Sequence, residues 1–251
     1  MRHREAVGWW GNVIGVSSDL LRERLHGVGE EIARASERSG RRTEEVKLLV
    51  ASKYYDADQM KALKEAGVKL VGENRAEELS EKQARFGADF EWHFIGHLQR
   101  RKVKDVISHV ENIQSVDSIR LVKEIAKRAE NPAKVLLQVN VSGEEAKYGV
   151  AEAEVEELLE AAAGTGGKVD VAGFMTIAPA VERASDVRYV FARLREVRER
   201  LRQSWSPHFD LSELSMGMSS DYAVAVEEGS TIVRIGRVLI EEGEPAVRRR
   251  T

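Results

Sequence analysis

The sequence predicts an α/β fold, a single (β/α)8 barrel of the TIM type with an extra N-terminal helix. Eight short, apolar, β-branched runs alternate with charged stretches of helical period, and one such stretch fills each of the seven gaps. The runs over residues 135–139 and 231–235 are almost continuously apolar, which is typical of parallel strands buried on both faces. This number of βα units within 251 residues favours a closed barrel over an open doubly wound sheet.

The expected elements follow one another in a regular order. The first is a helix over residues 18–38, which Ser18 can cap and Gly40 ends. Strands are expected over residues 46–52, 68–72, 91–95, 111–116, 134–141, 169–177, 211–216 and 231–236. Helices are expected between them, over residues 56–66, 74–86, 98–108, 118–130, 151–163, 183–203 and 220–228.

Residues 18–240 are expected to form one domain, because no linker rich in Gly, Pro or Ser divides the chain. Residues 1–17 form an N-terminal extension and residues 241–251 a basic tail, and both are expected to be mobile. Only about fifteen residues follow the last strand, so the leading helix is expected to cover the barrel where a final helix would lie.

Composition excludes several classes of function. A net charge of -3 gives no electrostatic footprint for nucleic acid, and the absence of cysteine excludes disulfides and thiolate catalysis. No run of about 18 apolar residues could span a membrane, and the N-terminus lacks a secretory apolar segment, so we expect a cytoplasmic protein. His93 and His97 are four residues apart, but their segment favours a strand and offers no third ligand, so no metal site is expected.

Lys53 stands at the end of the first apolar run, directly after Ala51 and Ser52. Active sites of (β/α)8 barrels lie at the carboxyl ends of the strands, so this position predicts an amine at the barrel mouth. Partial desolvation there would favour the uncharged form of the amine, which can attack an aldehyde. A surface lysine that merely follows a strand is the simpler alternative.

The ends of the last two strands carry what a phosphate group requires. Gly217 and Gly236 permit close approach of the backbone, and Ser215 and Ser219 offer hydroxyls beside backbone N–H groups. Phosphates often bind the loops after strands seven and eight of such barrels. A cap for the 220–228 helix is an alternative role for the serines, and both roles can hold together.

Arg234 interrupts the apolar last strand. An unpaired buried guanidinium is costly, so Arg234 must meet either a ligand or a carboxylate, such as that of Glu73 or Asp210. An amine, a phosphate nest and an arginine at one barrel mouth fit pyridoxal 5′-phosphate (PLP), which carries one aldehyde and one phosphate.

Six segments in order along residues 46–237 carry a family resemblance. They are Ala-Ser-Lys at 51–53, Gly-Glu-Asn at 72–74, the segment 92–99, Gln-Val-Asn at 138–140, the Ser-Met-Gly-Met-Ser segment within 214–219, and the Arg-Ile-Gly segment within 229–236. Together they resemble the pyridoxal phosphate homeostasis protein family, whose barrel is like the N-terminal domain of alanine racemase. The resemblance implies an internal aldimine at Lys53, with Arg234 facing the pyridine nitrogen and Asn74 lining the cofactor. The phosphate would then be held by Ser219, Ser215 and the backbone of Gly236 and Arg237.

The chain departs from the family pattern around the rim of the mouth. The usual Thr-Lys-Pro after the lysine is replaced by residues 54–56, Tyr-Tyr-Asp, and the usual Phe-Gly near the end of the barrel by residues 240–241, Ile-Glu. Arg75 replaces a tyrosine, and Arg101 replaces an asparagine. Arg237 replaces a threonine or serine, which removes a hydroxyl from the phosphate nest and supplies a charge instead.

The resemblance implies a protein that binds, stores and delivers PLP inside the cell without strong catalysis. The related racemases take a second catalytic base, a tyrosine, from a separate domain, which is not expected here because the chain ends just after strand eight. Arg234 keeps its proton, so it favours a neutral pyridine nitrogen and weakens the ring as an electron sink. A weak amino-acid racemase, or a Schiff-base aldolase that uses Tyr54, Tyr55 or His97, remains the enzymatic alternative.

The expected partners are PLP itself and apo forms of PLP-dependent enzymes, and a monomer is favoured over an oligomer. Lys147 matches a lysine typical of the family and is either a loop lysine or a second, looser acceptor for the aldehyde.

Overall fold

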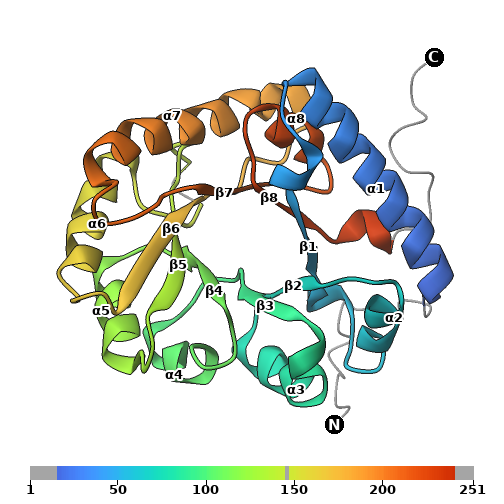
Figure 1. Cartoon of the computed structure of the whole chain (residues 1–251), viewed down its shortest axis with the longest axis horizontal. Helices are drawn as coiled ribbons and strands as arrows, with labels where there is room; N and C mark the ends of the chain where they lie inside the picture. Colours follow the sequence, from blue (N-terminus) through green and yellow to red (C-terminus); the bar gives the residue numbers. More distant parts are fainter. Residues whose placement is uncertain (1–15, 145–146, 241–251) are drawn as a thin grey trace, which may run out of the picture.

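A computed structural model describes residues 16–144 and 147–240. The expectations of mobility for the N-terminal extension and the C-terminal tail lie outside these residues, apart from Val16 and Ser17. Eight parallel strands form a closed barrel in sequence order, as predicted (Figure 1). The strands are β1 (Lys47–Ala51), β2 (Leu70–Glu73), β3 (Glu91–Phe94), β4 (Asn112–Val116), β5 (Ala133–Gln138), β6 (Val169–Met175), β7 (Glu213–Met218) and β8 (Ile232–Ile235).

Helices surround the barrel and connect its strands. They are α1 (Ser18–Arg38), α2 (Met60–Glu65), α3 (Ala76–Phe86), α4 (Val103–Val106), α5 (Ile119–Arg128), α6 (Val155–Ala163), α7 (Arg188–Trp205) and α8 (Tyr222–Glu227). Two predicted helices are shorter than expected. The helix predicted over residues 56–66 starts only at Met60, and the helix predicted over residues 98–108 begins with the 3-10 turn Arg100–Lys102. Among the described residues, no helix is long and apolar enough to cross a membrane.

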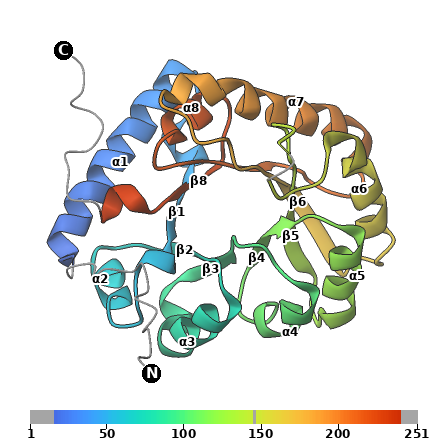
Figure 2. The same cartoon turned by 180° about the vertical axis from the view of Figure 1, so that it is seen from behind.

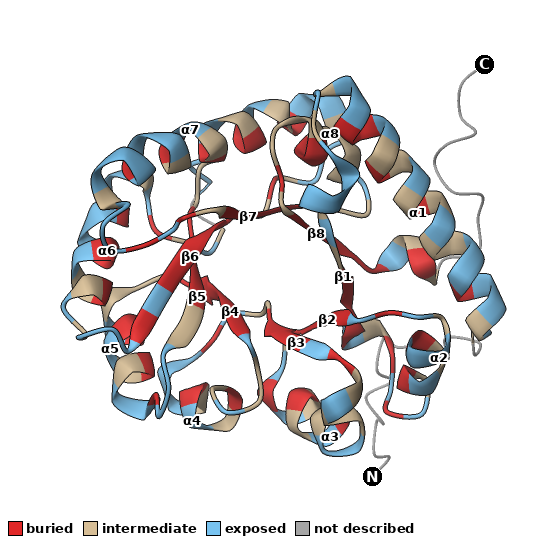
Figure 3. Ribbon diagram, in the orientation of Figure 1, coloured by how far each residue is buried: buried red, intermediate tan, exposed pale blue. Residues whose placement is uncertain are grey.

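Most strand residues are buried (Figure 3). The two faces of the barrel wall belong to different hydrophobic cores. Outward-facing residues such as Val50, Trp92 and Val233 pack against the apolar stripes of the helices. A second, smaller cluster fills the barrel interior and consists of Leu49, Leu70, Leu136, Ala172, Met175 and Ile232. The alternation along β8 is therefore Ile232 inward, Val233 outward and Arg234 inward, because successive side chains point to opposite faces of a strand.

Helix α1 covers the seam between the first and last strands, as predicted. It lies beside α8 in both views of the barrel (Figures 1 and 2), and Arg24 in α1 donates a hydrogen bond to the carbonyl oxygen of Leu239 at 2.7 Å. The predicted cap Ser18 is wrong by one residue, because the Ser17 hydroxyl accepts from the backbone N–H of Leu20 at 3.2 Å. Gly40 follows the helix with a φ of 68°, a conformation that glycine adopts without strain.

Candidate functional site at the barrel mouth

Lys53 lies in the 3-10 turn Ser52–Tyr54, directly after β1. Its side chain is exposed, and its Nζ atom lies 5.0 Å from the centroid of the Tyr54 ring. The expectation of a partly desolvated amine is therefore wrong for this structure, because β1 ends at Ala51 and the turn carries Lys53 out of the strand. The turn nevertheless places the amine at the carboxyl end of β1, as predicted.

The turn that carries Lys53 rests on a buried ion pair. Lys82 in α3 places its Nζ 2.7 Å from Glu73 Oε2, with the two side chains 4% and 0% exposed. The same Nζ donates to the carbonyl oxygen of Ser52 at 3.0 Å, and the Ser52 hydroxyl donates to Glu73 Oε2 at 2.8 Å. The alternative in which Glu73 pairs with Arg234 is not observed, because Glu73 contacts Lys82 and Ser52 and Arg234 donates to Ser215.

Asn74 follows β2 and is held by its backbone. Its N–H donates to Glu73 Oε1 at 2.7 Å, and the loop after β3 packs so closely that a Cβ on Gly96 would lie 2.1 Å from the Asn74 carbonyl oxygen. The side-chain oxygen of Asn74 is buried and has no hydrogen-bond partner within the described residues. A buried acceptor without a donor is unfavourable, so this oxygen marks a position where a ligand could supply one.

Arg234 is buried inside the barrel and points toward β6 and β7. Its Nη1 donates to Ser215 Oγ at 2.6 Å, and its Nη2 donates to the carbonyl oxygen of Thr176 at 2.7 Å. Burial lowers the pKa of Arg234 to about 10, while the carboxylate of Asp221 acts in the opposite direction. No carboxylate forms an ion pair with Arg234 in the described part of the chain; the predicted alternative, Asp210, pairs instead with Arg202 at 3.5 Å.

Ser219 lies where β7 ends and faces the end of β8. Its hydroxyl oxygen accepts from the N–H of Gly236 at 3.2 Å and from the N–H of Val238 at 3.5 Å. A Cβ on Gly236 would lie 2.3 Å from the Tyr54 ring, so the turn after β1 contacts this cradle directly. Exposed Arg237 opens the 3-10 turn Arg237–Leu239 beside it. The structure thus brings together Ser219, Gly236 and Arg237, as predicted.

Ser215 does not join this cradle. It lies within β7, is fully buried, and its hydroxyl oxygen accepts from Arg234. Its proton is directed to Gln114 Oε1 at 2.6 Å. The phosphate-binding role expected for Ser215 does not fit this geometry, because inward-facing positions of β7 point into the barrel rather than toward the loop at its end.

The contacts of several residues around Arg234 and Ser219 were not predicted from the sequence. Tyr54 packs on Gly236, Thr176 and Gln114 extend the hydrogen bonds around Arg234, and Asp221 accepts from the backbone N–H of Met218 at 2.6 Å. A signal was available for Gln114, which is one of the polar residues within a fully buried strand.

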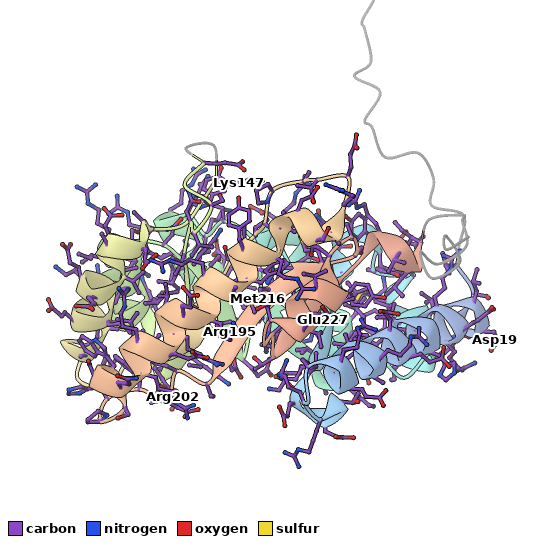
Figure 4. The ribbon with its side chains drawn as sticks, turned by 90° about the horizontal axis from the view of Figure 1, so that it is seen from above. Asp19, Lys147, Arg195, Arg202, Met216 and Glu227 are labelled. Carbon is purple, nitrogen blue, oxygen red and sulfur yellow. The ribbon has the colours of Figure 1, made fainter. Side chains whose placement is uncertain are left out.

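The opposite side of the mouth carries His97 and Tyr148. Their rings stack at 4.4 Å, and His97 Nδ1 lies 3.4 Å from Asp117 Oδ2. Burial raises the pKa of Asp117, and the neighbouring His97 counteracts that shift. Within residues 16–144 and 147–240 no cluster of metal-ligating side chains occurs, and His93 and His97 do not share a site. Lys147 lies at the mouth end of the barrel, far from Arg202 at the other end (Figure 4).

The fold and the residues at its mouth define a class of protein, the alanine racemase type of barrel. The family model for the N-terminal domain of alanine racemase matches residues 32–241. A solved alanine racemase from Corynebacterium glutamicum shares this fold, with a TM-score of 0.64 at 13% identity over 92% of this chain and 62% of that one.

Several relatives in sequence carry the name pyridoxal phosphate homeostasis protein. A pyridoxal phosphate homeostasis protein from Aquifex aeolicus is 45% identical over 224 residues, which cover 88% of this chain and 97% of the relative. PipY from Synechococcus elongatus, whose structure is solved with and without PLP, superposes with TM-scores of 0.70 and 0.76 at 33% and 32% identity, covering 88% of this chain and 100% of PipY. The chain belongs to the pyridoxal phosphate homeostasis protein family.

Proposed function

We propose that this protein binds PLP at the barrel mouth and serves intracellular PLP homeostasis, with Lys53 as the residue that holds the aldehyde. The observation that carries this proposal is the convergence of three groups on the adjacent strands β7, β8 and β1. These groups are the exposed amine of Lys53, the buried guanidinium of Arg234, and the hydroxyl and N–H cradle of Ser219 and Gly236.

The residues present fit the chemistry of PLP. When bound, PLP supplies an aldehyde that forms a carbon–nitrogen bond to a primary amine with loss of water. Lys53 provides that amine, and the Ser219 hydroxyl provides a donor for a phosphate. The N–H groups of Gly236 and Val238, which donate to the Ser219 hydroxyl oxygen in this structure, lie beside it. The unpartnered Asn74 oxygen is available to accept a hydrogen bond from the cofactor.

The site favours a carrier over a strong catalyst. Burial lowers the pKa of Arg234 only to about 10, so the guanidinium stays a donor at neutral pH and does not protonate the pyridine ring. A protonated ring is what makes the cofactor an effective electron sink, so a neutral ring weakens carbanion chemistry. Delivery to apo PLP-dependent enzymes, a cytoplasmic location and a monomeric state complete the proposal.

Two of the three candidate acid–base groups are not placed to serve an enzymatic alternative; the third, Tyr54, has its ring centroid 5.0 Å from Lys53 Nζ and packs on Gly236. Tyr55, one of the three candidate acid–base groups, is 3% exposed, and burial raises its pKa. Such a phenol does not exchange its proton near neutral pH. His97, a second candidate, contacts Asp117 and stacks on Tyr148 at the ends of β3, β4 and β5, across the barrel from β8.

Absorbance spectroscopy with purified protein tests the proposal. Added PLP should give a yellow, protein-bound band that is absent in Lys53→Ala, and borohydride reduction should fix the cofactor mass on the peptide that contains Lys53. Lys61→Ala is the matched control, because Lys61 is an exposed lysine of α2 whose partner is Glu65. Wild-type protein that never acquires the band would contradict PLP binding, and rapid amino-acid racemisation dependent on Lys53 would contradict the carrier role.

A further inference from the structure

A chain of hydrogen bonds crosses the barrel interior from its amino-terminal end to the mouth. Arg234 donates to Ser215, and the Ser215 hydroxyl lies 2.6 Å from Gln114 Oε1. Gln114 Nε2 lies 2.7 Å from His93 Nδ1, and His93 Nε2 lies 3.1 Å from Glu91 Oε1. Four of these five side chains are buried, while the Glu91 side chain is 47% exposed at the start of β3.

The two ends of the chain determine the direction of every bond within it. A guanidinium can only donate and a carboxylate can only accept, so donation must run from Arg234 toward Glu91. His93 therefore carries its proton on Nε2, and its Nδ1 accepts from the amide nitrogen of Gln114. The amide oxygen of Gln114 is then the acceptor for Ser215, whose own oxygen is free to accept from Arg234.

The charges at both ends are stable near neutral pH. The hydrogen bond from His93 holds the pKa of Glu91 below its usual value, although partial burial opposes this, so the far end remains an anion. Within a barrel of low polarity, hydrogen bonds in series polarise one another, and a buried network with every member satisfied holds its groups in one arrangement. Removal of one link leaves its neighbours free to rotate.

We infer that Gln114 and His93 are positioning residues, which hold the guanidinium of Arg234 in the single orientation that PLP binding requires. The inference rests on the proposed function. Neither residue lies at the mouth: His93 and Gln114 sit on β3 and β4, whereas Arg234 sits on β8, four strands away from Gln114 around the barrel. Their effect on the cofactor is transmitted through Ser215.

The test replaces Gln114 with two residues of similar size. Gln114→Met removes both hydrogen bonds, and we expect PLP affinity to fall about tenfold, which corresponds to the net contribution of one hydrogen bond, with a shift of the absorption band of the bound cofactor. Gln114→Glu keeps the acceptor for Ser215 but replaces the amide donor to His93 Nδ1 by an acceptor, so it breaks the chain at His93 and should also lower the affinity and shift the band. Ser215→Ala breaks the same chain with a smaller change of volume and should reproduce the band shift.

Asn112→Val is the matched control, because Asn112 is also a buried polar residue on the inner face of β4. Its amide donates to Glu213 at 3.2 Å, outside the chain, so the variant should keep the wild-type affinity and band. If both Gln114→Met and Ser215→Ala keep the wild-type affinity and absorption band, this inference is overturned, while the proposed function is unaffected. The same shift in Asn112→Val would also overturn the inference, and a wild type that binds no PLP would overturn the proposed function with it.

Discussion

Substitution of Lys82 by methionine isolates the buried ion pair that supports the Lys53 turn. Lys82 Nζ and Glu73 Oε2 are 2.7 Å apart, and the two side chains are almost inaccessible to water. Removal of the cation leaves Glu73 charged, desolvated and with only the Ser52 hydroxyl and the Asn74 N–H as donors. Loss of one partner from a buried pair costs about 3–5 kcal/mol, so we expect a decrease of that size in the free energy of unfolding.

An exposed pair of equal length provides the comparison. Lys64 Nζ lies 2.7 Å from Asp89 Oδ1, but the two side chains are 54% and 27% exposed. Because water screens this pair, Lys64→Met should cost no more than about 1 kcal/mol. The double variant of Lys82→Met with Glu73→Gln removes the orphaned charge and should recover most of the loss.

Urea unfolding followed by circular dichroism measures all four proteins, and the slope with denaturant shows whether unfolding stays two-state. Equal losses for Lys82→Met and Lys64→Met would refute the argument from burial, since the two pairs have the same length. A double variant no more stable than Lys82→Met would show that the cost arises from lost packing of the lysine stem rather than from the uncompensated carboxylate.

Three further outcomes are expected. Gly236→Ala should lower PLP affinity, because its Cβ would lie 2.3 Å from the Tyr54 ring, and a second substitution, Tyr54→Ala, should restore binding in equilibrium dialysis. Asn74→Ala should lower PLP affinity without a loss in unfolding free energy, because the Asn74 oxygen has no partner among the described residues. Because the pKa of Glu91 is lowered in the folded protein, its carboxylate should stabilise the fold at pH values above the ordinary glutamate pKa. This contribution should disappear as the pH falls through the lowered pKa. Urea unfolding midpoints measured against pH should therefore change differently for the wild type and for Glu91→Gln.

For each of these three predictions, one experimental result would contradict the reasoning. If Tyr54→Ala does not restore PLP binding to Gly236→Ala, contact with the Tyr54 ring is not the cause of the lost affinity. Destabilisation of Asn74→Ala by more than about 1 kcal/mol would mean that its amide contributes to the fold. Parallel pH profiles for the wild type and Glu91→Gln would show that the His93 hydrogen bond adds no pH-dependent stability.

The architecture could be predicted because it depends on patterns that are local in the sequence. A short apolar run indicates each strand, and an amphipathic stretch indicates each helix. Parallel strands joined by helices close into a barrel with few alternatives. The carboxyl ends of the strands follow from the same order, so Lys53, Asn74, Ser219, Arg234 and Gly236 were placed at one mouth. Strand and helix boundaries were displaced by a few residues, because turns depend on contacts with neighbours.

The partners of the buried charges could not be predicted. Glu73 pairs with Lys82 and Arg234 bonds to Ser215 and Thr176, although the sequence suggested that Glu73 and Arg234 could meet each other. The choice among possible partners depends on which inward-facing side chains lie at the same height along the barrel axis. That height follows from strand register and from the irregular pairing of β7 with β8 between Ser215 and Met218.

The sequence by itself therefore determined the barrel, its family and most of the residues at its mouth, because hydrophobic periodicity and short motifs are properties of neighbouring positions. Only the tertiary structure decided that the Lys53 amine is exposed, that Ser215 serves Arg234 rather than a phosphate, and that Gln114 and His93 link Arg234 to the far end of the barrel. These features join strands that are far apart in the chain. The contacts of Ser215, Gln114 and His93 arise because a buried polar group without a partner is unfavourable, and only the closed barrel determines which partners are within reach.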